Sequence, residues 1–113
     1  MSYDDEAELT RYVLRHHPSL LSPFEAQVQR AAYAREKFAD DTGEHARRVM
    51  ERFGRLGDPR IDAALAGGIE GFRRSACGRI LAEHSELRIN RCPLCRRVMR
   101  TPAAMQCFWC GHD

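Results

Sequence analysis

The cysteines near the end of the chain are the residues whose type and spacing predict chemistry. Cys92 and Cys95 form one Cys-x-x-Cys pair, and Cys107 and Cys110 form a second pair after eleven intervening residues. Four thiolates fill the tetrahedral shell of a metal ion such as Zn²⁺ and leave no open position for a reactive water molecule. The spacing therefore predicts a structural metal site. Zinc is the expected cofactor, and iron in a rubredoxin-like site is the alternative.

Disulfides and a redox pair are two further interpretations of the same motif. The first six residues are acidic and contain no apolar stretch typical of a signal peptide. We therefore expect a cytoplasmic protein, and in a reducing cytosol this spacing favours a metal over disulfides. Two pairs so close together also favour shared ligation of one ion over a single redox-active pair.

The motif resembles a zinc ribbon, in which each cysteine pair lies on a tight turn and glycine often follows the second pair. Gly111 fits this pattern, whereas Arg96 stands at the matching position after the first pair and departs from it. The resemblance covers residues 87–113 and implies a zinc module with four cysteine ligands, but no activity. The whole chain also resembles small bacterial proteins that end in such a ribbon and have no established activity.

Helix signals fill the chain before this module. Acidic residues precede a first helical stripe that Pro18 ends. Ser22-Pro23 followed by Glu25 predicts a capping box at the start of a second helix, and a third apolar stripe spans residues 46–56. Asp58-Pro59 predicts a further helix start by the same cap chemistry.

The last helix and the ribbon complete the expected fold. Gly67-Gly68 separates a short helix from a longer one over about residues 69–84. Alternation over residues 87–90 predicts a strand, and residues 98–100 and 104–106 are the expected arms of a hairpin. We therefore expect a mainly α protein, with a four- to five-helix domain over residues 1–85 and a zinc-ribbon module with a short β-hairpin over residues 86–113.

Residues that are catalytic in other proteins lack suitable partners in this sequence. His16 and His17 precede a proline at a helix end, where a cation is favourable, and Cys77 lies in an apolar helical stripe typical of a small buried residue. The glycines at 67, 68 and 71 are not followed by the lysine of a phosphate-binding loop. We therefore expect no catalytic residues, no enzyme activity and no small-molecule substrate.

Charge and hydropathy limit the partners of the protein. The net charge is only +2, and no apolar run reaches the roughly 20 residues of a membrane span. Residues 86–113 hold two acidic side chains against five basic ones: Arg88, Arg91, Arg96, Arg97 and Arg100.

These features favour a protein partner and no membrane, which predicts a small protein-interaction module such as an adaptor, regulator or inhibitor. The alternative is nucleic-acid binding, with phosphate contacts from Arg96, Arg97 and Arg100 and base stacking on Trp109. The orientation of the arginines discriminates between the two. One open basic face favours nucleic acid, whereas paired or scattered arginines favour a protein.

Overall fold

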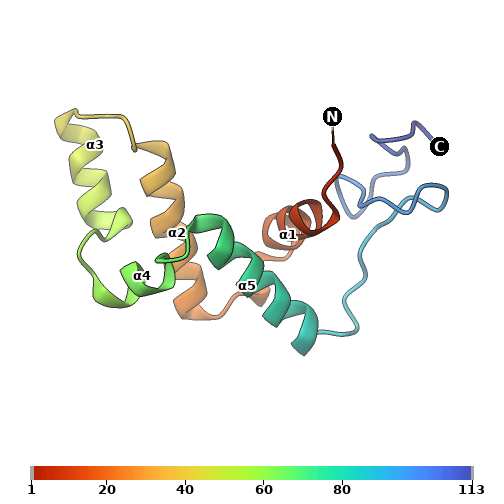
Figure 1. Cartoon of the computed structure of the whole chain (residues 1–113), viewed down its shortest axis with the longest axis horizontal. Helices are drawn as coiled ribbons and strands as arrows, with labels where there is room; N and C mark the ends of the chain where they lie inside the picture. Colours follow the sequence, from red (N-terminus) through yellow and green to blue (C-terminus); the bar gives the residue numbers. More distant parts are fainter. Residues whose placement is uncertain (1, 113) are drawn as a thin grey trace. The chain divides into compact units, whose positions relative to one another are not determined.

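The computed structural model describes residues 2–112, which are mainly helical (Figure 1). They form five α-helices: α1 (Asp5–His16), α2 (Pro23–Lys37), α3 (Glu44–Val49), α4 (Pro59–Ala64) and α5 (Ile69–Glu83). A 3-10 turn, η1 (Pro18–Leu20), follows α1, and a π-helical turn, η2 (Met50–Gly54), continues α3. The prediction of a mainly α fold is confirmed. None of the described helices combines the length and the apolar character needed to cross a membrane.

Local cap chemistry sets the helix boundaries where the sequence predicts them. The Ser22 hydroxyl accepts a hydrogen bond from the Glu25 backbone N–H at 3.1 Å, and the Glu25 carboxylate accepts one from the Ser22 N–H at 2.8 Å. This capping box satisfies two backbone donors at the start of α2. The Asp58 carboxylate caps α4 in a similar way, by accepting from the Arg60 N–H at 3.0 Å. Gly68, with a φ of +93°, lies between α4 and α5.

The chain divides into two compact units. The first unit combines the residues up to Leu20 with those from Arg74 onwards, and the second comprises Leu21–Arg73. The division falls within α5, so α5 contributes residues to both units. The domain boundary predicted between residues 85 and 86 is a statement about which segments fold independently. This division into compact units does not test it, so it stays a prediction.

In the second unit, α2 packs against the π-helical turn η2. Its buried apolar side chains are mostly small, and they include Val28, Ala31, Ala32, Ala34, Ala46 and Ile61. Arg35 ties the two elements together, because its guanidinium donates to the Gly54 carbonyl at 2.7 Å and to the Arg55 carbonyl at 3.0 Å. The Gly54 carbonyl lies at the end of η2, where carbonyls lack a partner within the helix, so Arg35 supplies its donor. The Arg55 carbonyl also accepts from the Asp58 N–H at 3.1 Å. Asp62 balances the charge of Arg35 at 2.8 Å.

In the first unit, α1 and the C-terminal part of α5 supply buried side chains of the helical core. Tyr12 and Val13 on α1, and Ala76, Cys77 and Ile80 on α5, are all almost fully buried. Burial raises the pKa of the Cys77 thiol, while a hydrogen bond with Thr10 opposes that shift. Cys77 is therefore the small buried residue that the sequence predicts.

The β-hairpin expected in residues 86–113 does not form in the part of the chain that the structure describes. One isolated antiparallel bridge, between Arg91 and Val98, is the only β pairing there. Backbone groups of the expected arms form hydrogen bonds with Asn90. The Asn90 amide donates to the carbonyls of Thr101 and Ala104, both at 2.9 Å, and the Met99 N–H donates to the Asn90 carbonyl at 2.8 Å. One residue from each expected arm, Met99 and Ala104, therefore bonds to Asn90.

Candidate metal centre

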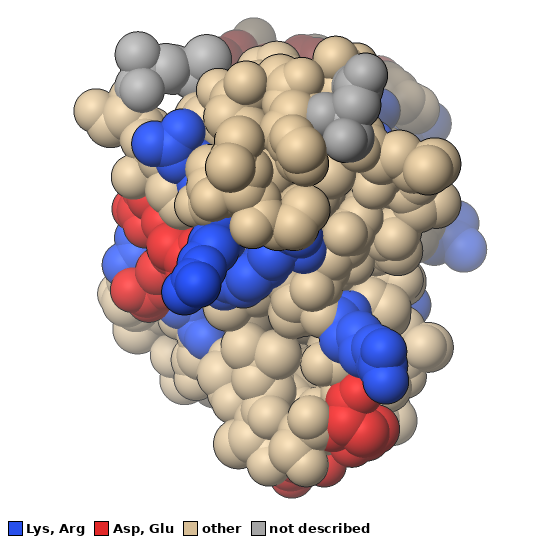
Figure 2. All heavy atoms as spheres, turned by 90° about the vertical axis from the view of Figure 1, so that its right-hand side faces the viewer, with Lys and Arg blue, Asp and Glu red and all other residues tan. Residues whose placement is uncertain are grey.

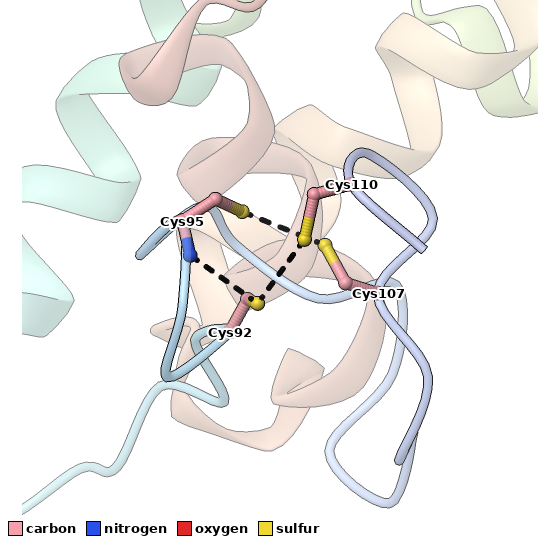
Figure 3. A group of neighbouring side chains, drawn as sticks. All are labelled: Cys92, Cys95, Cys107 and Cys110. Carbon is pink, nitrogen blue, oxygen red and sulfur yellow. Dashed lines mark hydrogen bonds between the residues drawn. The ribbon is translucent and has the colours of Figure 1, made fainter. Parts of the chain in front are cut away.

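The four cysteines of the two pairs converge on one point (Figure 3). All four Sγ atoms lie within 4.8 Å of one another, and the pairs Cys92–Cys110 and Cys95–Cys107 are each 3.6 Å apart. Four sulfurs at about 2.3 Å from a central ion form a tetrahedron with edges of about 3.8 Å. The spacing of the thiols therefore fits a tetrahedral four-thiolate site for one metal ion.

The two Cys-x-x-Cys turns have the same backbone hydrogen bonds. In the first turn the Cys92 N–H donates to the Arg97 carbonyl at 2.9 Å, and the Arg96 N–H donates to the Cys92 carbonyl at 2.8 Å. In the second turn the corresponding bonds join Cys107 to His112 at 2.8 Å and Gly111 to Cys107 at 2.9 Å. The site is thus built from two copies of one local motif, each of which contributes two sulfurs.

The residue after each pair has a left-handed backbone conformation. Gly111 has a φ of +76°, as the sequence predicts for a glycine at this position, and Arg96 has a φ of +65°. The first turn therefore keeps the geometry of the second despite the missing glycine. A non-glycine residue in this region costs roughly 1–2 kcal/mol. The strain at Arg96 is the local cost of placing Cys92 and Cys95 correctly.

Backbone N–H groups aimed at the sulfurs favour the thiolate form. The Cys95 N–H lies 3.4 Å from the Cys92 Sγ, and this contact is the largest cause of the fall in the Cys92 pKa to about 6. The Cys110 pKa is lowered by the His112 backbone but raised more by burial and by the three neighbouring thiols, to about 12. Four sulfurs this close cannot all ionise without a cation between them.

Asn90 organises the loop that holds the second cysteine pair. Besides its contacts with Met99, Thr101 and Ala104, its backbone N–H donates to the Tyr12 hydroxyl oxygen at 3.2 Å. Asn90 thereby joins the cysteine-bearing segment to α1. Behind the site, Cys92, Met99 and Cys107 form a small buried cluster, and Trp109 packs against it. Sequence reasoning missed Asn90, because a lone polar residue in an apparent strand gives no signal of such a role.

The segment around the start of α1 also supports the metal centre. The Val98 N–H donates to the Tyr3 hydroxyl oxygen at 2.8 Å, and the Tyr3 ring meets Trp109 edge-on at 4.9 Å between centroids. The Arg91 guanidinium makes two hydrogen bonds to the Asp5 carboxylate, at 2.8 and 3.2 Å, and lowers the pKa of that carboxyl. These partners are more than 80 residues apart in sequence, so no local pattern could reveal them.

The residues expected to contact nucleic acid differ in their surroundings: some lie against other side chains of the chain, and one is exposed. The Arg97 guanidinium lies over the rings of Tyr3 and Trp109, and Arg100 stacks on Phe108 at 3.7 Å. Arg96 is exposed at the left-handed position described above. Figure 2 shows one face of the molecule, where some basic groups adjoin in a band beside acidic groups and others lie apart. Two of the three arginines and Trp109 are therefore engaged within the chain.

No protein-family model, no curated protein and no solved structure matches the chain. The four-cysteine cluster therefore rests on the geometry of this chain alone. The zinc-ribbon resemblance, and the wider resemblance of the whole chain, stay predictions.

Removing one ligand should release α1 together with the cysteine-bearing segment. We expect Cys107→Ser to abolish stoichiometric metal binding and to remove hydrogen-exchange protection from residues 90–110 and from α1, because Tyr3, Asp5 and Tyr12 lose their partners. Residues 21–73 should keep their protection. Hydrogen exchange followed by mass spectrometry measures the lost protection and the retained protection. Cys77→Ser, outside the cluster, is the control for loss of a thiol. A protected α1 in Cys107→Ser would contradict this expectation and would favour the boundary at residue 85.

The strain at Arg96 gives a second prediction. Arg96→Gly should tighten metal binding by several-fold, because glycine adopts the left-handed conformation without strain, although it loses more backbone entropy on folding. Gly111→Ala should weaken metal binding, and the cause would be the backbone alone, since an added Cβ there meets no atom within 4 Å. Competition with a chromophoric chelator measures both affinities. Equal affinity in all three proteins would show that the turns relax without cost.

Proposed function

We propose that the protein is a non-catalytic, structural-zinc protein that acts as a small protein-interaction module. Zinc is the metal that a closed four-thiolate tetrahedron suits best in a site without redox chemistry. Bound zinc would stabilise the fold of the first unit, because a segment with so small a buried cluster depends on the metal for much of its folding free energy. Cys92, Cys95, Cys107 and Cys110 would supply all four ligands, which leaves no open coordination position for catalysis.

A groove on the second unit carries the interaction hypothesis. It has a volume of about 580 Å³ and lies along α2, α3 and η2. Its walls are mostly apolar, and two of its aromatic side chains are exposed: Tyr33 at 62% and Phe53 at 45%. Phe53 belongs to the π-helical turn, and such turns occur frequently at functional sites. Exposed aromatic side chains beside an apolar groove are typical of protein-binding surfaces.

The charges around this groove indicate the kind of partner. Arg30 and Lys37 line it, and the lining contains no acidic residue. Lys37 lies over the rings of Tyr33 and Phe38, so a positive charge sits directly beside the apolar surface. An amphipathic helix of the partner, with apolar residues at helical spacing and acidic residues on its flanks, would complement both features.

The arginines near the cysteines also support a protein partner over nucleic acid. Arg91 is paired with Asp5, and Arg97 and Arg100 lie against aromatic rings of the chain. By the criterion given under Sequence analysis, paired or scattered arginines favour a protein partner. Nucleic-acid binding by Arg96, Arg97, Arg100 and Trp109 remains the second hypothesis. It would require Arg97 and Arg100 to exchange these contacts for phosphates.

The metal hypothesis makes a direct prediction. Protein purified without added metal should contain close to one equivalent of zinc by elemental analysis, and replacement by Co²⁺ should give the visible absorption of a tetrahedral four-thiolate site. Cys77→Ser should keep the full equivalent, and Cys92→Ser should lose it. Iron in place of zinc, with the colour of a ferric thiolate site, would sink the zinc assignment.

The groove hypothesis is tested with helical peptides displayed against the zinc-loaded chain. We expect selection of sequences with apolar residues at positions i, i+3 or i+4, and i+7 and with acidic flanks. Phe53→Ala should weaken a selected peptide about 30-fold or more, as loss of a central aromatic anchor worth about 2 kcal/mol does. Leu56→Ala is the matched control, since Leu56 is 61% exposed but lies outside the groove lining. Equal losses in the two variants, or selection of basic peptides, would refute the hypothesis.

A further inference from the structure

A second cavity, of about 540 Å³, lies within the first unit between α1 and the cysteine-bearing segment. Its volume falls in the range of ordinary small-ligand pockets, about 300–1,000 Å³. The His16 ring contributes to holding its two walls together, since the His16 Nε2 donates to the Arg100 carbonyl at 3.0 Å. The structural metal would stabilise one of these walls but would take no part in binding, because all of its ligand positions are filled.

The lining of this cavity is basic. Three arginines contribute to it, Arg11, Arg15 and Arg100, against one acidic residue, Glu8. Arg15 has no ion pair or hydrogen bond among the described residues, and Arg11 has only a long contact with Glu8, at 3.7 Å. The guanidinium groups on α1 are therefore available to an anion from outside the chain.

The opposite wall is aromatic. Phe108 and Trp109 line the cavity, and Phe108 is 47% exposed, with Arg100 stacked on its ring. Trp109 packs edge-on against both Tyr3 and Phe108, which fixes its ring. An exposed aromatic ring beside a guanidinium is the arrangement on which a flat heterocycle stacks.

We propose that this cavity binds a nucleotide, with its base against Phe108 and Arg100 and its phosphate at Arg11 and Arg15. The ligand is either a free nucleotide or one nucleotide of a single strand, and the recognition chemistry is the same for both. Neither the base alone nor the phosphate alone would bind tightly. Glu8 and the formal charge of −2 on a zinc-loaded four-thiolate centre oppose binding of phosphate alone, and a base alone leaves Arg11 and Arg15 unused. This site is separate from the groove on the second unit, so either proposal can fail without the other.

Trp109 provides the measurement, because it is the only tryptophan of the chain and it lines the cavity. We would titrate the zinc-loaded chain with adenosine monophosphate, adenosine, inorganic phosphate and a single-stranded ten-nucleotide oligonucleotide, and follow Trp109 fluorescence. We expect the monophosphate to bind at least tenfold more tightly than adenosine or phosphate. An oligonucleotide that binds tenfold more tightly still would assign the source to a single strand, whereas equal affinity per site would assign it to the free nucleotide.

Variants distinguish nucleotide binding in the cavity from nonspecific attraction of the nucleotide by positive charge. The double variant Arg11→Ala with Arg15→Ala should weaken nucleotide binding at least tenfold. The double variant Arg47→Ala with Arg88→Ala, which removes the same charge from exposed positions outside the lining, should leave it unchanged within about twofold. Phe108→Ala should weaken binding at least fivefold while the chain keeps one equivalent of zinc. The proposal is overturned if no nucleotide binds at millimolar concentration, if both double variants lose the same affinity, or if a polyglutamate peptide competes as well as the nucleotide.

Discussion

Four ionisable sulfurs held within 4.8 Å of one another are the constraint on which the first unit depends. Thiolates at this distance repel one another strongly where solvent is partly excluded, so the arrangement needs a cation at its centre. The backbone conformation holds the four sulfurs at these distances. Two turns with identical hydrogen bonds present the sulfurs, and at Arg96 a strained residue maintains the pattern. The buried cluster behind the sulfurs is too small to hold that geometry by apolar burial alone.

The second feature of this unit is that it joins the two ends of the chain. Asp5 pairs with Arg91, Tyr3 accepts from Val98, and Tyr12 accepts from Asn90. Closing a loop of this length costs entropy that grows only slowly with the number of residues. A few specific contacts can therefore offset that cost once the cysteine-bearing segment is fixed. The cysteine-bearing segment and α1 consequently support each other through these contacts.

The groove and the cavity described above differ in chemistry, and this difference separates the two proposed activities. The groove along α2, α3 and η2 is apolar with basic residues beside it, which suits the face of an amphipathic helix. The cavity beside α1 combines arginines with an exposed aromatic ring, which suits a nucleotide. A structural metal takes part in neither contact. A bound metal would stabilise one wall of the second site, so both proposals are compatible with a closed coordination shell.

The sequence alone determined what depends on near neighbours. The cysteine spacing predicted the cluster of four thiols. The caps at Ser22 and Asp58 predicted the starts of α2 and α4, because hydrogen bonds over two to three residues decide them. The break at Gly67-Gly68 predicted the separation of α4 from α5. The expected β-hairpin does not form in the described residues, because Asn90 takes backbone partners of both expected arms, the Met99 N–H and the Ala104 carbonyl. Only the tertiary structure decided that Tyr3, Asp5 and Tyr12 support the metal centre, that Arg97 and Arg100 lie on aromatic rings, and that α1 supplies Arg11 and Arg15 to a cavity. Most of those contacts join residues far apart in the chain, and no periodicity or spacing along the sequence predicts any of them.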